Sequence, residues 1–412
     1  MLGGAAIGET RIEGLLEGED VLATADAMRA LGAHINRDTE GVWRVTGRGV
    51  GGLREPGQVL DLGNSGTAVR LLMGLVGGQA FSSTFTGDAS LCRRPMERIM
   101  APLREAGIQF TSRDGGRLPI TVTGPETVLP IEYTLPVASA QVKSAILLAS
   151  LNAPGKTTVI EPQPTRDHSE LMLRHFGAQV AVTDQDDGSR RITLSGQPEL
   201  EAADIVVPGD ISSAAFPMVA ALLVPGSKIK LQGIGINPLR AGLVTTLKEM
   251  GASISIDNQR GGAGDPLADL TVTAGPLIGV DVPAARAPSM IDEYPVLAVA
   301  AALATGTTRM NGLAELRVKE SDRLAAMANG LTAAGVEVEE TEDTLIVQGT
   351  GQAPRGGVMI NADLDHRIAM AFLVLGMVSE QPMTIDDASP IETSFPDFAG
   401  LMNGLGADIR SV

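Results

Sequence analysis

One pattern occurs six times in the sequence, and this repetition limits the possible fold more than any other feature. In each copy an amphipathic, helix-like stretch runs into a glycine and then into an alternating, strand-like stretch. The glycines lie roughly 70 to 85 residues apart, at Gly32, Gly107, Gly177, Gly251, Gly335 and Gly406. A glycine at this point can end a helix in the left-handed conformation. Because a strand-like run precedes each helix, the sequence predicts an α/β fold of six related strand, helix, strand copies.

Five of the six copies carry a second helix upstream, and this helix is apolar on nearly all sides. Helices of this kind belong inside a domain. Each follows a strand-like run, so the complete unit reads strand, helix, strand, helix, strand. The apolar helices begin with polar residues, namely Asn64 and Ser65, Ser139, Ser212 and Ser213, Ser289 with Asp292, and Asp365 to Arg367. These residues can be simple helix caps, or, if several starts converge, their N–H groups and helix dipoles can form an anion site.

The first copy departs from the pattern. Only residues 1–8 precede its first strand-like run, residues 10–15, and they read as the tail of a buried helix. We therefore expect this copy to lack about one strand and half a helix. Such a loss predicts an empty place beside an edge strand and uncovered apolar surface.

Composition excludes several classes of protein. The 412 residues are 44% hydrophobic and 20% charged, which predicts two or three folded domains. A net charge of -17 argues against nucleic acid and anionic membranes as partners, because binding phosphate-rich surfaces needs a basic face. The single cysteine, Cys92, excludes an internal disulfide and fits a reducing compartment. No apolar stretch is long enough to span a bilayer and no targeting segment is evident, so we expect a cytoplasmic protein.

The most densely charged stretch runs from Arg317 to Arg323. It holds three cations and two carboxylates within seven residues. We expect a helix to start near Val318, which places Lys319 and Arg323 on one face beside Glu320. One helical turn then offers cations for a phosphate and an acid for proton transfer. The alternative is a solvated helix start held by salt bridges.

Nine segments, in this order along the chain, resemble the enolpyruvyl transferases, and most closely the 5-enolpyruvylshikimate-3-phosphate synthases of the glyphosate-tolerant bacterial type. They are residues 60–74, 87–99, 136–149, 165–170, 208–217, 288–295, 316–324, 365–370 and 394–398. The resemblance implies a two-domain, inside-out α/β barrel of six strand-helix-strand-helix-strand units, the first one incomplete, with helices inside and sheets outside. The domains are expected at residues 1–205 and 206–412, closing over the ligands.

The resemblance also implies a reaction. The family transfers the enolpyruvyl group of phosphoenolpyruvate to the 5-hydroxyl of shikimate 3-phosphate and releases phosphate through a tetrahedral intermediate, a step of the shikimate pathway to chorismate and the aromatic amino acids. It requires no metal or organic cofactor. A cytoplasmic monomer inhibited by glyphosate is implied as well.

By motif position, the resemblance assigns roles to eleven residues. Those implied for shikimate 3-phosphate are Ser139, Ala140, Gln141, Arg166, Asp292 and Lys319, and those for phosphoenolpyruvate are Gly66, Arg94, Gln141, Arg323 and Arg367. Asp292 is expected to accept the hydroxyl proton and Glu320 to move the proton at the methylene carbon.

The physical chemistry of the reaction agrees with these roles. Two phosphates and two carboxylates come together, so several Lys and Arg are needed to offset their repulsion. Addition of an alcohol across an enol ether needs a base at oxygen and an acid at carbon, which suits two carboxylates in different environments. We expect Asp292 to begin a buried helix and Glu320 to lie among cations, so that their proton affinities diverge.

Three features bear on the alternatives. The family's amino-terminal motif, whose Lys contacts both ligands, has no counterpart here, which keeps an inactive, truncated relative in view. The related UDP-N-acetylglucosamine enolpyruvyl transferases carry a loop Cys before an Arg-Pro pair, whereas Cys92 lies only two residues before Arg94, so we interpret it as an incidental thiol. His168 and His175 share a helical face without a third ligand nearby, which favours packing or surface positions over a metal site.

Overall fold

A computed structural model describes residues 1–262 and 264–411 and divides the chain into two compact units. Unit 1 comprises Met1–Val207 with Gly262–Asp265, and unit 2 comprises Pro208–Gly261 with Pro266–Val412. The expected boundary at residue 205 lies two residues before this division. Each unit has its own cluster of buried hydrophobic side chains, so each is described separately below.

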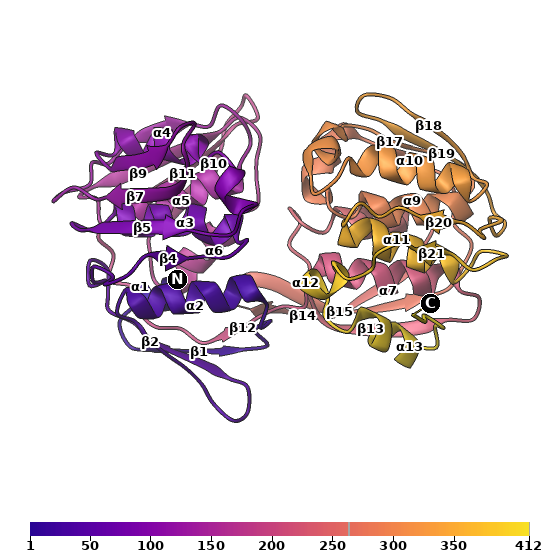
Figure 1. Cartoon of the computed structure of the whole chain (residues 1–412), viewed down its shortest axis with the longest axis horizontal. Coiled ribbons are helices and arrows are strands. Elements are labelled where there is room, and N and C mark those ends of the chain that lie inside the picture. Colours follow the sequence, from indigo (N-terminus) through magenta and orange to yellow (C-terminus); the bar gives the residue numbers. More distant parts are fainter. Residues whose placement is uncertain (263, 412) are drawn as a thin grey trace. The chain divides into compact units, whose positions relative to one another are not determined.

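Unit 1 holds three four-stranded sheets, drawn in indigo to magenta in Figure 1. In spatial order the strands are β12 (Ile205–Val206), β1 (Glu9–Glu13), β3 (Trp43–Thr46) and β2 (His34–Arg37) in the first sheet, β4 (Leu60–Asp61), β5 (Ser82–Thr86), β7 (Arg117–Thr123) and β6 (Gln109–Arg113) in the second, and β8 (Glu132–Thr134), β9 (Lys156–Glu161), β11 (Arg190–Ser195) and β10 (Val180–Asp184) in the third.

Within its described residues, unit 2 holds three further sheets, of three, four and two strands. In spatial order the strands are β13 (Lys228–Gly235), β15 (Asp265–Thr273) and β14 (Ser253–Gly262) in the first, β16 (Asp281–Val282), β17 (Thr305–Met310), β19 (Leu345–Thr350) and β18 (Glu337–Glu340) in the second, and β20 (Met359–Ile360) with β21 (Thr384–Ile385) in the third. The ends of β14 and β15, at Gly262 and Asp265, belong to unit 1.

Four of the six sheets in the described residues share one order of strands. A short strand pairs in parallel with a longer one, as β4 does with β5, and the longer strand pairs antiparallel with the second arm of a hairpin, as β5 does with β7 of the β6–β7 hairpin. The sequence interpretation therefore missed one strand in most copies, because the expected unit contains no equivalent of β3, β7, β11, β15 and β19. Each sheet is open, so within the described residues the strands close no barrel, and the sheets of the predicted two-domain α/β fold remain separate from one another.

The strand position beside β1 is occupied, which makes one prediction wrong. β12 lies parallel to β1, with Ile205 opposite Ile12 and Val206 opposite Glu13. This place was predicted to be empty. The first sheet of unit 2 correspondingly has three strands, and an isolated bridge joins Gly209 to Ile234. Parallel partners far apart in the chain leave no local sequence signal, because neither turn nor register ties them together.

The apolar helices form the cores, as predicted. They are α3 (Gly66–Gly77) and α5 (Ala140–Ser150) in unit 1 and α7 (Ile211–Leu223), α9 (Tyr294–Leu303) and α11 (His366–Gly376) in unit 2. In α9 every residue except Leu303 is buried. Residues 1–8 contain α1 (Leu2–Ala5), four buried residues, which confirms their interpretation as part of a buried helix.

Amphipathic helices lie between the first and last strands of the repeats. They are α2 (Glu19–Ala30), α4 (Glu97–Glu105), α6 (His168–His175), α8 (Gly242–Glu249), α10 (Arg323–Ala333) and α13 (Phe398–Gly404); shorter helices are α12 (Ile391–Ser394) and the 3-10 helices at Leu91–Arg93, Ala284–Ser289 and Ala314–Val318. The six glycines that follow the amphipathic helices all have positive φ, between 91° and 107°, which confirms that they end these helices.

The expected strand after Gly406 is wrong. Residues 407–411 form no strand; instead the side chain of Asn403 accepts a hydrogen bond from the amide of Ile409 at 2.7 Å and donates one to its carbonyl at 2.8 Å. Both backbone groups of Ile409 are thus satisfied without a neighbouring strand.

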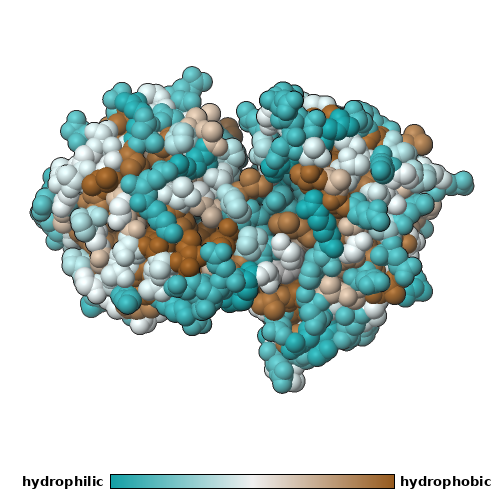
Figure 2. Space-filling view, turned by 180° about the vertical axis from the view of Figure 1, so that it is seen from behind, coloured by the Kyte–Doolittle hydropathy of each residue, from teal (hydrophilic) through white to brown (hydrophobic). Residues whose placement is uncertain are grey.

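Both hydrophobic and hydrophilic side chains are exposed on the surface. Figure 2 shows one face, on which hydrophobic residues lie among hydrophilic ones. Among the described residues no helix is both long and apolar enough to cross a bilayer.

Candidate active site

In unit 1, α3 and α5 lie side by side and bring two helix starts together (Figure 1). A Cβ atom at Gly74 would lie 2.2 Å from the carbonyl oxygen of Ala145, so only glycine permits this close approach. At the amino ends of the same helices, Nε2 of Gln141 donates to Oγ1 of Thr67 at 2.9 Å. Because the helices run in parallel, the positive ends of both dipoles point to the same side.

Arginines surround these helix starts. Nη1 of Arg70 donates to Oε1 of Gln141 at 2.9 Å, while its buried Nε has no hydrogen-bond partner among the described residues. Burial, together with the positive charges of Arg98 and Arg94, lowers the pKa of Arg70 to about 10. Three guanidinium groups that repel one another, beside two helix amino ends, form a site that an anion stabilises.

Gly66 and Arg94 belong to this arginine cluster. Nη2 of Arg94 donates to Oδ1 of Asn64 at 2.8 Å and to Oγ of Ser90 at 3.3 Å. A Cβ atom at Gly66 would lie 3.0 Å from Nη1 of Arg70 and 3.1 Å from Nη1 of Arg94. The structure therefore brings together three of the residues predicted for phosphoenolpyruvate, namely Gly66, Arg94 and Gln141.

The residues predicted for shikimate 3-phosphate in unit 1 come from two segments. Ser139 is the N-cap of α5, where its Oγ accepts from the amide of Val142 at 3.4 Å, and Ala140 is the first helical residue. Arg166 is half-buried in the connection between β9 and α6, directly after Thr165, whose amide donates to Oε2 of Glu161 at 3.4 Å. The expectation that Ser65 and Ser139 cap their helices is confirmed.

In unit 2 the cations gather around Asp292. Its Oδ1 lies 3.4 Å from Nη1 of Arg323 and 3.6 Å from Nζ of Lys319, and its Oδ2 lies 3.9 Å from Nη1 of Arg240. Nη1 of Arg367 donates to the carbonyl oxygen of Asp292 at 3.2 Å. All five residues predicted in unit 2, including Glu320, therefore belong to one cluster.

Arg323 is fixed by a buried carboxylate. Only 1% of its side chain is exposed, and its Nε and Nη2 donate to the two oxygens of Asp365 at 2.8 and 3.3 Å. Asp365 also accepts from Oγ of Ser321 at 3.0 Å and caps α11 through the amide of Arg367 at 2.9 Å. Burial acts to raise the pKa of Asp365, but the hydrogen bonds and charge of Arg323 outweigh it, so this pKa lies below its usual value. One carboxylate thus positions Arg323 and the start of the helix that carries Arg367.

The predicted helix start near Val318 is wrong. A 3-10 helix ends at Val318, and α10 begins only at Arg323, with Asp322 as its N-cap accepting from the amide of Ala325 at 3.0 Å. Lys319 and Glu320 therefore lie in the non-helical segment between two helices. Asp322 stops the helix from starting earlier because its side chain takes the place of a backbone acceptor. Lys319 and Glu320 still contact the cluster, since Oε2 of Glu320 lies 2.5 Å from Nη2 of Arg323.

The two predicted proton-transfer groups lie in different environments, and both contact cations. Asp292 lies two residues before the start of α9, is 17% exposed, and has three cations within 4 Å. Glu320 is 53% exposed and pairs with Arg323.

A buried acid adjoins Asp292. The side chain of Glu293 is fully buried, accepts from Oγ of Ser212, and lies 3.8 Å from Nη2 of Arg240 and 3.9 Å from Nη1 of Arg367. Burial raises the pKa of Glu293, against the opposing effect of both arginines. Glu293 thus attracts the guanidinium groups of Arg240 and Arg367, and both groups also contact Asp292.

Five members of these clusters were not predicted as site residues, namely Arg70, Arg98, Arg240, Glu293 and Asp365. Arg70 lies one helical turn after Gly66, and that spacing could have identified it. Asp365 was predicted only as part of a helix start. Its pairing with Arg323, 42 residues away in the chain, leaves no local sequence signal. Arg240 and Glu293 meet only through the packing of unit 2.

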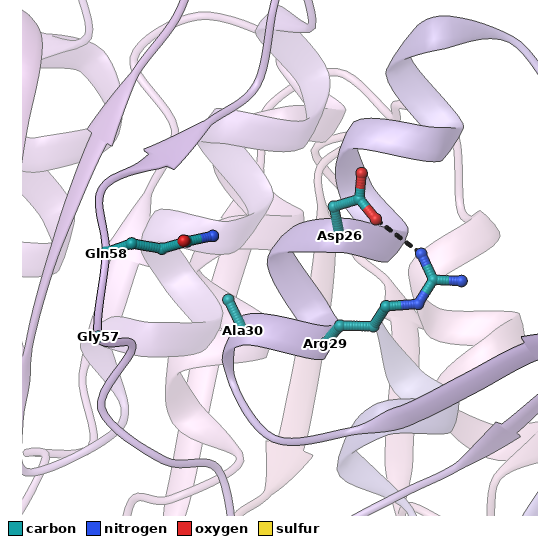
Figure 3. A pocket seen from close by; sticks show the side chains of 5 residues that line it. All are labelled: Asp26, Arg29, Ala30, Gly57 and Gln58. Atoms are coloured by element: carbon teal, nitrogen blue, oxygen red, sulfur yellow. Dashed lines mark hydrogen bonds and ion pairs between the residues drawn. The ribbon is translucent and has the colours of Figure 1, made fainter.

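Other hollows and polar groups lie apart from the predicted residues. Figure 3 shows a hollow of about 620 Å³ lined by Asp26, Arg29, Ala30, Gly57 and Gln58, in which the charges of Asp26 and Arg29 pair at 2.6 Å. A second hollow, of about 470 Å³, is lined by Cys92, Arg113, Asp114, Arg117 and Leu118, and the thiol of Cys92 donates to the carbonyl of Gly87 at 3.2 Å. His168 and His175 have different partners, Asp265 at 3.7 Å and the carbonyl of Asp204 at 3.0 Å.

Comparison with known proteins identifies the family. The model of EPSP synthase (3-phosphoshikimate 1-carboxyvinyltransferase) matches residues 1–402. The 3-phosphoshikimate 1-carboxyvinyltransferases of Paramagnetospirillum magneticum and Granulibacter bethesdensis are each 63% identical over 409 residues, covering 99% of this chain and 92% and 90% of the relative.

Solved structures agree with this match. EPSP synthase from Acinetobacter baumannii superimposes with a TM-score of 0.93 at 45% identity, covering 100% of this chain and 93% of that one. The enolpyruvyl transferase NikO from Streptomyces tendae, at 20% identity and a TM-score of 0.76, shares the fold, with 99% and 92% covered. The chain belongs to the EPSP synthase (3-phosphoshikimate 1-carboxyvinyltransferase) family.

Proposed function

We propose that this protein transfers the enolpyruvyl group of phosphoenolpyruvate to the 5-hydroxyl of shikimate 3-phosphate and releases phosphate. The observation that carries the proposal is the cluster in unit 2, where two acids, Asp292 and Glu320, lie among Lys319, Arg323 and Arg367. Anionic substrates need the cations, and the addition of an alcohol to an enol needs the acids. Relatives at about 60% identity carry the name of this activity.

In the proposed mechanism the two acids have separate tasks. Asp292 accepts the proton of the 5-hydroxyl as its oxygen bonds to the second carbon of phosphoenolpyruvate, and Glu320 donates a proton to the methylene carbon, which becomes a methyl group. The resulting tetrahedral intermediate loses a methyl proton back to Glu320 as the carbon–oxygen bond to phosphate breaks, and the hydroxyl proton leaves with phosphate. The exposure of Glu320 fits a group that reaches a substrate carbon, while the cations around Asp292 fit a base beside anionic substrates.

Unit 1 supplies the other proposed contacts. Gly66, Arg94 and Gln141 bind phosphoenolpyruvate at the paired helix starts, and Ser139, Ala140 and Arg166 bind the phosphate of shikimate 3-phosphate. The support is the group of three arginines beside two helix amino ends, whose mutual repulsion an anion relieves. On this proposal residues 1–205 and 206–412 are two enolpyruvyl transferase domains of three repeats each.

The test is phosphate release by the purified chain. With phosphoenolpyruvate and shikimate 3-phosphate we expect turnover at a rate on the order of 1 to 100 per second. With UDP-N-acetylglucosamine in place of shikimate 3-phosphate we expect none. Release with the sugar nucleotide alone favours the cell-wall alternative, and release with neither favours an inactive relative.

A further inference from the structure

Unit 1 contains a group of three buried ionisable residues to which no role has been given above. Nζ of Lys143 lies 3.0 Å from Oε1 of Glu161 and 2.7 Å from Oε1 of Glu170, and the three side chains are 0%, 0% and 1% exposed. We name these three residues the Lys143 clamp. Burial of ion pairs is costly, and apolar groups of the same shape often stabilise a fold equally well. A role in positioning other residues therefore explains these buried charges better than a contribution to stability does.

The members of the clamp come from three elements that meet at the predicted substrate contacts. Lys143 lies in the first turn of α5, two residues after Gln141. Glu161 is the last residue of β9, and Glu170 is the third residue of α6. The connection between these two acids, residues 162–167, carries Arg166. Lys143 thus ties both ends of the Arg166 connection to the helix that begins with Ala140.

Two further contacts act in the same direction. The amide and the hydroxyl of Thr165 donate to the two oxygens of Glu161, which fixes the residue before Arg166. Oγ of Ser144 and Oγ of Ser169 lie 2.6 Å apart, which joins the next residue of α5 to the residue before Glu170. The connection is therefore held at its start, at Thr165 and at its end.

The charges of the clamp predict a sharp response to substitution. One cation faces two carboxylates in a site without solvent, and burial raises the pKa of Glu170 against the effect of Lys143. Nζ of Lys143 and both oxygens of Glu170 have no hydrogen bond besides these ion pairs in the described part of the chain. Loss of one charge thus leaves partners that no other group can satisfy.

We propose that the Lys143 clamp positions Arg166 against the first turn of α5, and that it thereby sets the affinity for shikimate 3-phosphate. The inference rests on the proposed function, because it assigns Ser139 and Arg166 to that substrate. The clamp residues are positioning residues and touch no substrate themselves.

The experiment compares two clamp variants with a matched control. Glu170→Gln removes one charge and keeps the shape, and the triple variant Lys143→Met, Glu161→Gln, Glu170→Gln removes all three charges together. The control is Leu147→Ala, because Leu147 is fully buried in the same helix and belongs to the core. The KM for each substrate, kcat and the melting temperature are measured for all three variants and the wild type.

We expect the clamp variants to raise the KM for shikimate 3-phosphate about ten- to a hundredfold, because a small displacement of Arg166 costs that much. The KM for phosphoenolpyruvate should change by less than about twofold. The control should lower the melting temperature and leave both KM values near wild type. Unchanged KM values in a folded clamp variant, or equal rises in the control, overturn the proposal. If Glu170→Gln does not fold, the triple variant carries the test, since no charge in it is left unpaired.

Hydrogen exchange in the ligand-free protein separates this inference from the proposed function. The clamp predicts faster exchange of residues 162–167 in Glu170→Gln than in Leu147→Ala, whichever reaction the enzyme catalyses. A wild type without phosphate release contradicts the proposed function alone. Equal exchange in the two variants contradicts the clamp alone.

Discussion

Replacement of Asp365 by Asn should destabilise unit 2 far more than its small chemical change suggests. Asp365 is fully buried and gives both oxygens to Arg323, which is itself 1% exposed. Asn keeps the shape and still caps α11, but its NH2 group faces the N–H groups of Arg323. Breaking a buried ion pair by removing one partner costs about 3 to 5 kcal/mol, and the pairs of Arg323 with Glu320 and Asp292 offset part of this loss. For a unit of about 200 residues this corresponds to a melting temperature lower by about 6 to 20 °C.

The matched control is Asp210→Asn. Asp210 also caps a helix, α7, by accepting from the amides of Ser212 and Ser213, but its side chain is 55% exposed and lies 4.0 Å from Arg240. Because Asn is as good a cap and solvent screens the charge, we expect a change of at most about 1 kcal/mol. Urea unfolding of both variants measures the two free energies of unfolding. Equal losses in the two variants would refute the reasoning.

The effect of Asp365→Asn should also depend on pH. The pKa of Asp365 is lower in the folded protein than in the unfolded chain, so its ionised form stabilises the fold above the unfolded pKa of about 4. This contribution is lost as the pH falls below that value. The difference in stability between wild type and variant should therefore shrink on acidification below about pH 4, and a difference that grows there contradicts the assigned ionisation.

Three further predictions follow from the sites. Asp292→Asn and Glu320→Gln should each lower kcat on the order of a hundredfold or more at unchanged fold; near-normal turnover in both excludes these roles. Gly66→Ala should weaken glyphosate more than phosphoenolpyruvate, because the new methyl lies about 3 Å from two guanidinium groups, and equal inhibition constants before and after substitution contradict it. Burial and the charges of Arg367 and Arg323 lower the pKa of His366 to about 4. The free energy of unfolding of the wild type should therefore fall by at most about 3 kcal/mol relative to that of His366→Gln as the pH falls from about 6.5 to 4. Acid unfolding of both proteins measures this difference.

The sequence predicted those parts of the fold that leave a local or periodic signal. Gly32 and its five equivalents marked the helix ends, because a left-handed residue after a helix favours glycine wherever the chain folds. The apolar helices were equally predictable from the sequence, since a helix such as α9 has no polar face. Strands such as β7 form the second arm of a hairpin. They were missed because their residue pattern does not differ clearly from that of the neighbouring loop and strand.

Contacts between distant segments account for the rest. β12 pairs with β1 across nearly 200 residues, and a parallel partner without a turn cannot be predicted from either strand alone. Motif order brought Asp292, Glu320 and Arg323 into one site, but it gave neither the cap at Asp322 that delays α10 nor the cations around Asp292. Buried partners such as Asp365 and Glu293 are determined by packing, which only the folded chain shows.

The most direct test of the central claim is turnover in deuterated water, with the product examined by mass spectrometry. If Glu320 protonates the methylene carbon and later removes a proton from the methyl group, deuterium enters the vinyl group of the enolpyruvyl product. The account predicts a labelled product of shikimate 3-phosphate and phosphoenolpyruvate with the wild type, and loss of both product and label with Glu320→Gln. A product free of deuterium, or the same labelling in Glu320→Gln as in wild type, would contradict the proposed reaction path.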